Sequence, residues 1–105
     1  MSQSRLAIDL RGVVYPEQGQ WIAHCLELDV VAQGETRDDA VAGMIELCEF
    51  QIQTALEDGD LESIFRPAPS RFWQLYFSAN RRRKPARKSL TPPLNRIETR
   101  EMVLA

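Results

Sequence analysis

One continuous stretch, from Trp21 to Leu56, constrains the fold of this 105-residue chain more than any other. It reads WIAHCLELDVVAQGETRDDAVAGMIELCEFQIQTAL: two short apolar segments with a reversal between them, a glycine, and a long amphipathic segment. The period of two in the first part predicts strands, and the helical period in the second part predicts a helix. We therefore expect an α+β fold in which a strand pair leads directly into one long helix.

The long helix is predicted over about residues 36–58. Thr36 suits the N-cap position, and Asp39, three positions further on, stands where a capping box places its acidic residue. Gly59 supplies a C-terminal stop. A single apolar stripe follows from the helical spacing of Val41, Ile45, Cys48, Ile52, Ala55 and Leu56.

Three strands are predicted before this helix, over about residues 5–15, 20–26 and 29–34, as a three-stranded antiparallel sheet packed on the helix. The first strand alternates apolar and polar residues, and Pro16-Glu17-Gln18-Gly19 has turn chemistry, so a hairpin is expected. Both faces of the second strand are largely apolar. It therefore lies centrally in the sheet, or one face meets the helix and the other meets a partner.

After the long helix, the sequence predicts a short helix over about residues 70–80, a basic, Pro-containing linker over 81–95 and a C-terminal strand over about 96–104. The aromatic run RFWQLYFSAN of the short helix also suits a strand, so both interpretations stay open. The charged residues of RIETREMVL favour a place at a sheet edge for the last strand. All 105 residues are expected to form a single domain.

Phe50 does not belong to the apolar stripe of the long helix. It lies nine residues from Val41, and at about 100° per residue it points to the opposite side. Either the short helix or another subunit would cover this side. With Leu47 on the long helix and Trp73 and Phe77 on the short helix, Phe50 is a candidate for a partner or oligomer interface.

Charge is segregated along the chain. Residues 1–80 contain five arginines against thirteen Asp and Glu, a net charge of −8, whereas residues 81–105 contain eight Lys and Arg against two Glu, a net charge of +6. The run RRRKPARK can contact phosphates without reading sequence, through Arg81, Arg82, Arg83, Lys84, Arg87 and Lys88. The same run also suits a loop that neutralises the acidic body or a neighbouring subunit.

The sequence contains no evident catalytic constellation. His24 and Cys25 are adjacent, but neighbouring residues in a strand point to opposite faces and cannot share a proton. Carboxylates such as Asp9 would hold a metal for phosphodiester cleavage only if several converged, and strand alternation scatters them. Cys25 and Cys48 are expected to be buried thiols. We therefore predict no enzymatic activity, no metal site and no cofactor.

The chain is expected to be cytoplasmic. No apolar run approaches the roughly 18 residues of a membrane helix. The N-terminal residues MSQSRLAIDLRG show no secretory signal. No membrane partner is therefore predicted.

The stretch that begins at Trp21 resembles the N-terminal domain of the HicB antitoxin family. That family shows an aromatic-apolar-Ala strand, a Cys/Pro-Glu-Leu turn and a Gly-Asp/Glu-Thr helix start followed by acidic residues and an Ala. The matching positions here are Trp21, Ala23, Cys25, Glu27, Leu28, Gly34, Thr36, Asp39 and Ala40. The similarity covers about residues 5–58, and PAPSRFWQLYFSA also looks like one HicB-like subgroup.

The resemblance implies a partial RNase H-like fold without the nuclease site, assembled as dimers or tetramers. It also implies an antitoxin that neutralises a small HicA-type ribonuclease toxin by covering its active site. The family's usual helix-turn-helix is not expected, because the 25 residues after Asn80 are too few for it. DNA binding would then require the terminal strand to pair across a dimer as a ribbon. The alternative is a nucleic-acid-binding regulator that uses residues 81–88 and the C-terminal strand.

Overall fold

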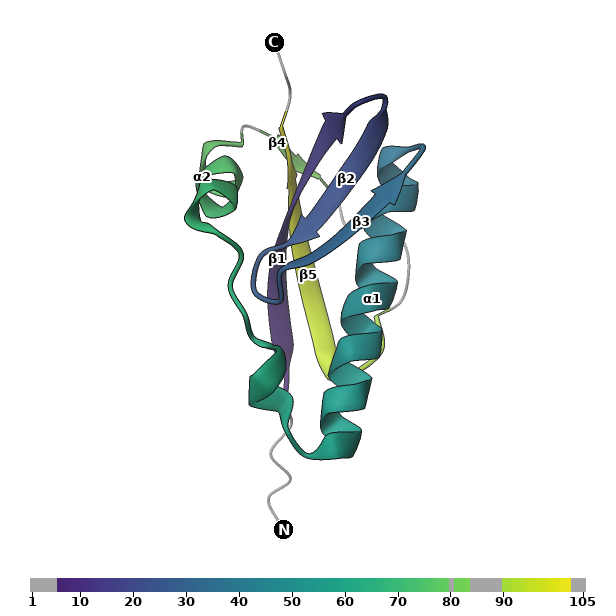
Figure 1. Ribbon diagram of the computed structural model, residues 1–105, viewed down its shortest axis with the longest axis vertical. Coiled ribbons are helices and arrows are strands. Elements are labelled where there is room, and N and C mark those ends of the chain that lie inside the picture. The colour runs from purple at the N-terminus through teal and green to yellow at the C-terminus, as the bar shows by residue number, and fades with distance from the viewer. Residues whose placement is uncertain (1–5, 80, 84–89, 103–105) are drawn as a thin grey trace.

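The computed structural model describes residues 6–79, 81–83 and 90–102, and it shows a five-stranded sheet between two helices (Figure 1). The strands are β1 (Ile8–Glu17), β2 (Gln20–Cys25), β3 (Val30–Gly34), β4 (Arg81–Arg83) and β5 (Leu94–Glu101). The helices are α1 (Arg37–Asp58), the short 3₁₀ helix η1 (Leu61–Ile64) and α2 (Ser70–Ser78). The predicted α+β class is confirmed, and the aromatic run that follows Pro69 is a helix.

The strand order is β3-β2-β1-β5-β4. The first three strands form the predicted antiparallel meander, and β5 runs parallel to β1. The prediction of a three-stranded sheet is therefore wrong, because the C-terminal strand joins the same sheet. The prediction of an edge position for this strand is also wrong, because β5 lies between β1 and β4. Residues 81–83, the start of the predicted linker, form the edge strand instead.

The interior position of β5 is possible because its charged residues have partners. Leu94 and Ile97 pack in the core under α1. Glu101 is buried and accepts a hydrogen bond of 3.1 Å from Nη1 of Arg37, the first residue of α1. Glu98 accepts a hydrogen bond from the Tyr76 hydroxyl of α2 on the other face. A charge-rich strand is thus satisfied inside the sheet, where paired polar groups avoid the cost of burial.

The turn of the first hairpin is shorter than the sequence suggests. Gln18 and Gly19 have positive φ values of 50° and 79°, as a two-residue type I′ turn requires. Glu17 therefore still pairs with Gln20, and β1 extends beyond the predicted end at residue 15.

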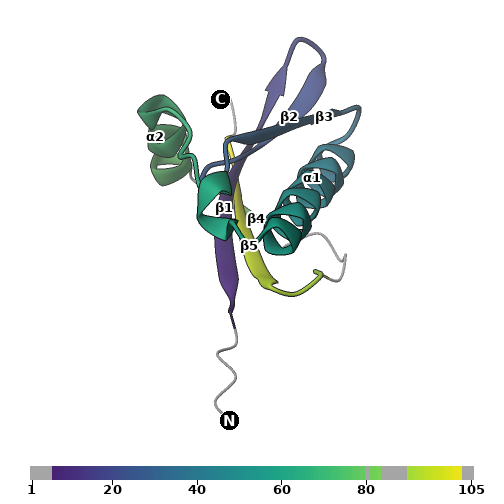
Figure 2. The ribbon, with the colours of Figure 1, turned by 60° about the horizontal axis from the view of Figure 1, so that its bottom comes forward.

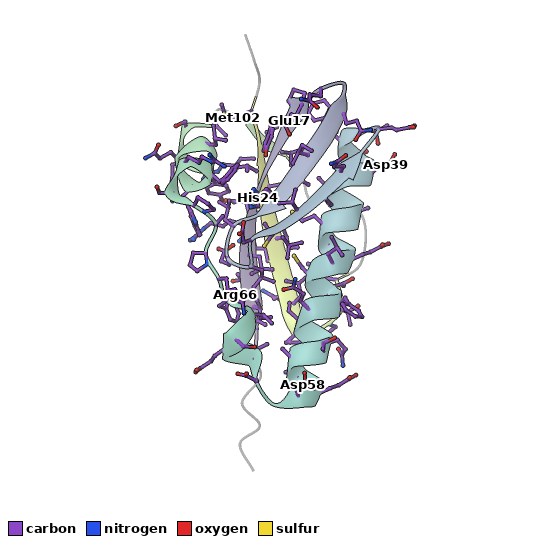
Figure 3. All side chains as sticks on the ribbon, viewed as in Figure 1. Glu17, His24, Asp39, Asp58, Arg66 and Met102 are labelled. Atoms are coloured by element: carbon purple, nitrogen blue, oxygen red, sulfur yellow. The ribbon has the colours of Figure 1, made fainter. Side chains whose placement is uncertain are left out.

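The long helix forms as predicted and covers one face of the sheet. Thr36 Oγ1 accepts a hydrogen bond of 3.0 Å from the N–H of Asp39, and Gly59, with a φ of 69°, ends the helix. Figure 3 labels Asp39 and Asp58 near the two ends of α1. The buried residues of α1 are Ala40, Val41, Met44, Ile45, Cys48, Ile52 and Ala55, which includes most of the predicted stripe.

The second helix covers the opposite face of the sheet. Tyr76 of α2 forms a separate core cluster with Val13 of β1, Leu26 and Ala68. Figures 1 and 2 show α1 and α2 on different sides of the sheet. The alternative in which the short helix covers Phe50 is therefore wrong, because α2 packs against the other face.

We expect Gly34→Ala to lower the free energy of unfolding by about 3 kcal/mol, because overpacking against backbone is not relieved by rotamer changes. A Cβ at Gly34 would lie 2.5 Å from the backbone N of Ala40 and 2.8 Å from Cβ of Asp39. The control is Gly43→Ala on α1, whose Cβ would lie 3.4 Å from Cβ of Ala32. This control should be neutral or stabilising by up to about 1 kcal/mol, because alanine favours the helix. Denaturant titrations measure both, and equal stability of the two variants would contradict the packing described.

Candidate functional site

Tyr76 fixes α2 to the sheet. This residue is 1% exposed, and its hydroxyl donates a hydrogen bond to Oε2 of Glu98 on β5. The guanidinium group of Arg100 lies 4.2 Å from the centre of the Tyr76 ring, and its Nη1 donates to the Tyr76 carbonyl at 3.2 Å. Burial, followed by the hydrogen bond to Glu98, raises the pKa of Tyr76 above its ordinary value. These contacts hold the other aromatic residues of α2 in place.

Two aromatic side chains of α2, Trp73 and Phe77, form a surface that we call the aromatic shelf. Their rings stack with centroids 6.4 Å apart and an interplanar angle of 27°. Phe77 is 66% exposed. On the sheet side, the guanidinium group of Arg11 lies 5.9 Å from the centre of the Trp73 ring. The shelf therefore presents apolar surface to solvent and continues onto the sheet through Arg11.

A charged groove lies next to the aromatic shelf on this face of the sheet. It is lined by Asp9, Leu10, Arg11, Glu27, Arg96 and Glu98. Arg11 pairs with Glu27 at 3.5 Å, and Arg96 pairs with Glu98 at 3.4 Å. Burial raises the pKa of the Glu27 carboxyl, although a hydrogen bond of 2.7 Å from the Arg11 backbone N–H acts in the opposite direction. The groove thus alternates three carboxylates with two guanidinium groups.

The acidic residues of the charged groove are engaged in hydrogen bonds and ion pairs. Asp9 accepts a hydrogen bond of 2.9 Å from Nδ2 of Asn95, while Glu27 and Glu98 face the arginines described above. Within the described part of the chain, no group of three or more His, Cys, Asp or Glu side chains is placed to hold a metal ion. The chemistry that this arrangement suits is the pairing of carboxylates with cationic groups of another molecule.

A second exposed apolar surface lies on the outer side of α1. Phe50 is 70% exposed and Leu47 is 44% exposed. After Arg37 the helix contains six Asp and Glu residues and no Lys or Arg. This side of the molecule therefore combines apolar residues with acidic ones.

The four predicted interface residues belong to two separate surfaces. Leu47 and Phe50 lie on α1, Trp73 and Phe77 lie on α2, and the sheet lies between the two helices (Figure 2). Among the predicted nucleic-acid contacts, the backbone of Arg81, Arg82 and Arg83 forms β4. Lys84, Arg87 and Lys88 lie outside the described residues.

His24 and Cys25 face opposite sides of the sheet, as the strand alternation predicts. Cys25 of β2 and Cys48 of α1 are buried as free thiols between the sheet and the helix, and the hydrogen bond between them, together with burial, raises the pKa of Cys48. His24 is 3% exposed, with Nε2 placed 2.6 Å from Oδ1 of Asp29 and its ring 4.3 Å from the Phe72 ring of α2. Figure 3 shows His24 in the middle of the sheet. His24 therefore joins the turn after β2 to α2.

The charged groove was not predicted from the sequence. It depends on the parallel register that places Asp9 beside Arg96 and Arg11 beside Glu98. The alternation of charged residues in each strand was the available signal. Neither strand alone shows which strand it pairs with or in which direction.

No protein-family model, curated protein or solved structure matches this chain. Among the described residues, no helix is both long enough and apolar enough to cross a membrane.

We expect Tyr76→Phe to lower the free energy of unfolding by about 1 kcal/mol at pH 7, because the variant loses the hydroxyl that donates to Glu98. Because the pKa of Tyr76 is raised in the folded state, its hydroxyl contributes fully to the free energy of unfolding below the ordinary pKa of 10.0. This contribution is lost as the pH rises further and the hydroxyl is deprotonated in the folded state. The difference between wild type and variant should therefore shrink above pH 10. Urea titrations at neutral and alkaline pH measure this difference. A difference that stays constant would show that Tyr76 is not held as described.

Proposed function

We propose that this chain is a HicB-like antitoxin, or an antitoxin-derived protein-binding module, that neutralises a small HicA-type ribonuclease toxin in the cytoplasm by direct binding. It acts through surface complementarity and without an enzymatic reaction of its own. The observation that carries the proposal is the aromatic shelf beside the charged groove, on a body whose first 80 residues have a net charge of −8.

The topology supports this proposal. A three-stranded antiparallel meander is followed by a long helix and later by a strand that lies parallel to the first strand. This order fits the partial RNase H-like fold that the HicB resemblance implies. The residues that carry the resemblance run from β2 through the first turn of α1, so they lie within this part of the fold. Assembly into dimers or tetramers is part of the same proposal.

The chemistry of the α2 side suits a ribonuclease as the partner. A protein that binds RNA phosphates carries Lys and Arg at its binding surface. Asp9, Glu27 and Glu98 line a groove in which the arginine partners of Glu27 and Glu98 can be exchanged for those of the toxin. Trp73 and Phe77 supply the apolar anchor, and aromatic residues of this kind dominate the binding energy of protein interfaces. The toxin's basic residues would then lie in the groove, so its RNA-binding surface would be covered.

We expect Phe77→Ser to weaken binding of the toxin at least tenfold, or about 1.4 kcal/mol, because the shelf loses its most exposed ring. The partner to be used is any small basic protein that an adjacent open reading frame encodes, co-expressed with the chain and titrated by calorimetry. Loss of growth rescue should accompany the weaker binding.

The matched control is Phe50→Ser, which removes an equally exposed phenylalanine from the other side of the sheet. Its dissociation constant for the toxin should stay within about threefold of the wild-type value, because a substitution at a distant site leaves the contacts of the shelf unchanged. If Phe50→Ser loses binding and Phe77→Ser retains it, the shelf is not the toxin site. If the adjacent frame encodes no such protein and no growth rescue occurs, the antitoxin function is wrong.

A nucleic-acid-binding regulator is the second candidate. In its favour, β4 places the first three arginines of the basic run at an edge of the sheet. Against it, β5 pairs on both sides with strands of its own chain, so the C-terminal strand is engaged in the fold. Binding by this route would weaken steeply with salt.

A further inference from the structure

A groove follows the C-terminal half of α1 on the side that carries Phe50. Two adjoining cavities form it, with volumes of about 290 Å³ and 380 Å³. The residues that line both cavities are Gln51, Ser63 and Ile64. Asp58 lines the first cavity and Arg66 lines the second, and Figure 3 labels both residues in the same half of the molecule. We call these two cavities together the α1–η1 groove.

The wall opposite α1 is held by the segment that follows this helix. The N–H of Asp60 donates to the carbonyl of Ala55 at 2.9 Å, so the chain turns back after Gly59. The hydroxyl of Ser63 donates to the carbonyl of Asp60 at 2.8 Å. Ile64 of η1 packs against the core under α1. The groove is therefore part of the fold of the free chain.

The α1–η1 groove combines an apolar wall with an acidic rim. Phe50, whose side chain is 70% exposed, stands beside the first cavity. Asp58 and Asp60 line the same cavity, and Asp29 lines the second one. Among the described residues that line the groove, Arg66 is the one with a cationic side chain. Three carboxylates and one guanidinium group thus surround an exposed aromatic ring.

The end of α1 carries carboxylates where a helix disfavours them. A helix C-terminus has a partial negative charge, which Lys or Arg in the last turn would compensate. The last turn of α1 contains no basic residue and ends with Glu57 and Asp58. An arrangement that breaks a local rule at a cost in stability is expected mainly at functional sites. A cationic group bound in the groove would supply the missing compensation.

We propose that the α1–η1 groove binds an extended basic segment of a partner protein other than the toxin. Lys or Arg side chains of this segment lie against Asp58 and Asp60, and a large apolar side chain between them packs on Phe50. Charge complementarity selects this occupant, because the same carboxylates repel acidic segments and nucleic acids. The aromatic shelf lies on the other side of the sheet, so this interaction goes beyond the proposed antitoxin function.

Titration of the full chain with the blocked peptide acetyl-Lys-Leu-Lys-Leu-Lys-amide, followed by nuclear magnetic resonance, tests the proposal. We expect a dissociation constant below about 1 mM in low salt. The constant should rise as salt is added, because salt screens the attraction between exposed charges. The backbone amides of Gln51, Thr54 and Ser63 should shift as the peptide binds. The matched peptide with Glu in place of each Lys should not bind.

Asp58→Asn separates binding from stability. It should weaken peptide binding about threefold, because the groove loses a carboxylate. It should also raise the thermal midpoint of unfolding by about 3 °C, because an unfavourable charge leaves the end of α1. The matched control is Glu17→Gln, which removes the same charge from the other end of the molecule (Figure 3) and should leave the dissociation constant unchanged.

Two further variants test the apolar wall and the sign of the charge. Phe50→Ser should weaken peptide binding at least tenfold, because the segment loses its aromatic contact. Arg66→Gln should tighten binding about twofold, because the cation that repels the peptide is removed.

A lysine peptide that does not bind in low salt overturns the proposal. Equal binding of the glutamate peptide overturns it as well, and so does binding that Phe50→Ser and Asp58→Asn both leave unchanged. If saturating toxin displaces the peptide, the groove belongs to the toxin site and the assignment to a separate partner is wrong. Toxin binding by Phe50→Ser is measured independently, so failure of this proposal and failure of the antitoxin function are distinguishable.

Discussion

The parallel pairing of β5 with β1 supports both helix layers of this protein. On one face β5 supplies Glu98 and Arg100, which hold Tyr76 and with it α2. On the other face it supplies Glu101, which accepts from Arg37 at the start of α1. Without β5, β1 would be an edge strand and both helices would lose a polar anchor. A strand that is distant in sequence therefore determines where the exposed aromatic residues lie.

This arrangement gives a small chain two separate surfaces. The aromatic shelf and the charged groove lie on the α2 side of the sheet, and the exposed side chains of Leu47 and Phe50 lie on α1, on the other side. One side offers carboxylates beside stacked rings, which suits a basic partner. The other offers two exposed apolar side chains on a helix that is rich in acidic residues. The sheet separates these two surfaces.

Local chemistry was enough to predict part of this structure. Thr36 and Gly59 marked the ends of α1, and strand alternation separated His24 from Cys25. The position of α2 could not be predicted, because it depends on the connector, where the N–H of Ala68 donates to the carbonyl of Leu26 at 2.7 Å. That contact carries the chain to the face opposite α1 and leaves Phe50 uncovered. The charged residues of β5 favoured an edge position because the sequence does not show their partners, which lie on distant elements. The charged groove could not be predicted either, because it depends on the register between β1 and β5.

The most direct test of this account is the direction and register of β5 beside β1, measured by nuclear Overhauser effects between backbone protons. The account predicts contacts that link Leu10 with Ile97 and Arg11 with Glu98, in the pattern of a parallel pair. Close contacts between α-protons across the two strands, as in an antiparallel pair, would contradict it. So would a C-terminal segment that shows no contact with β1.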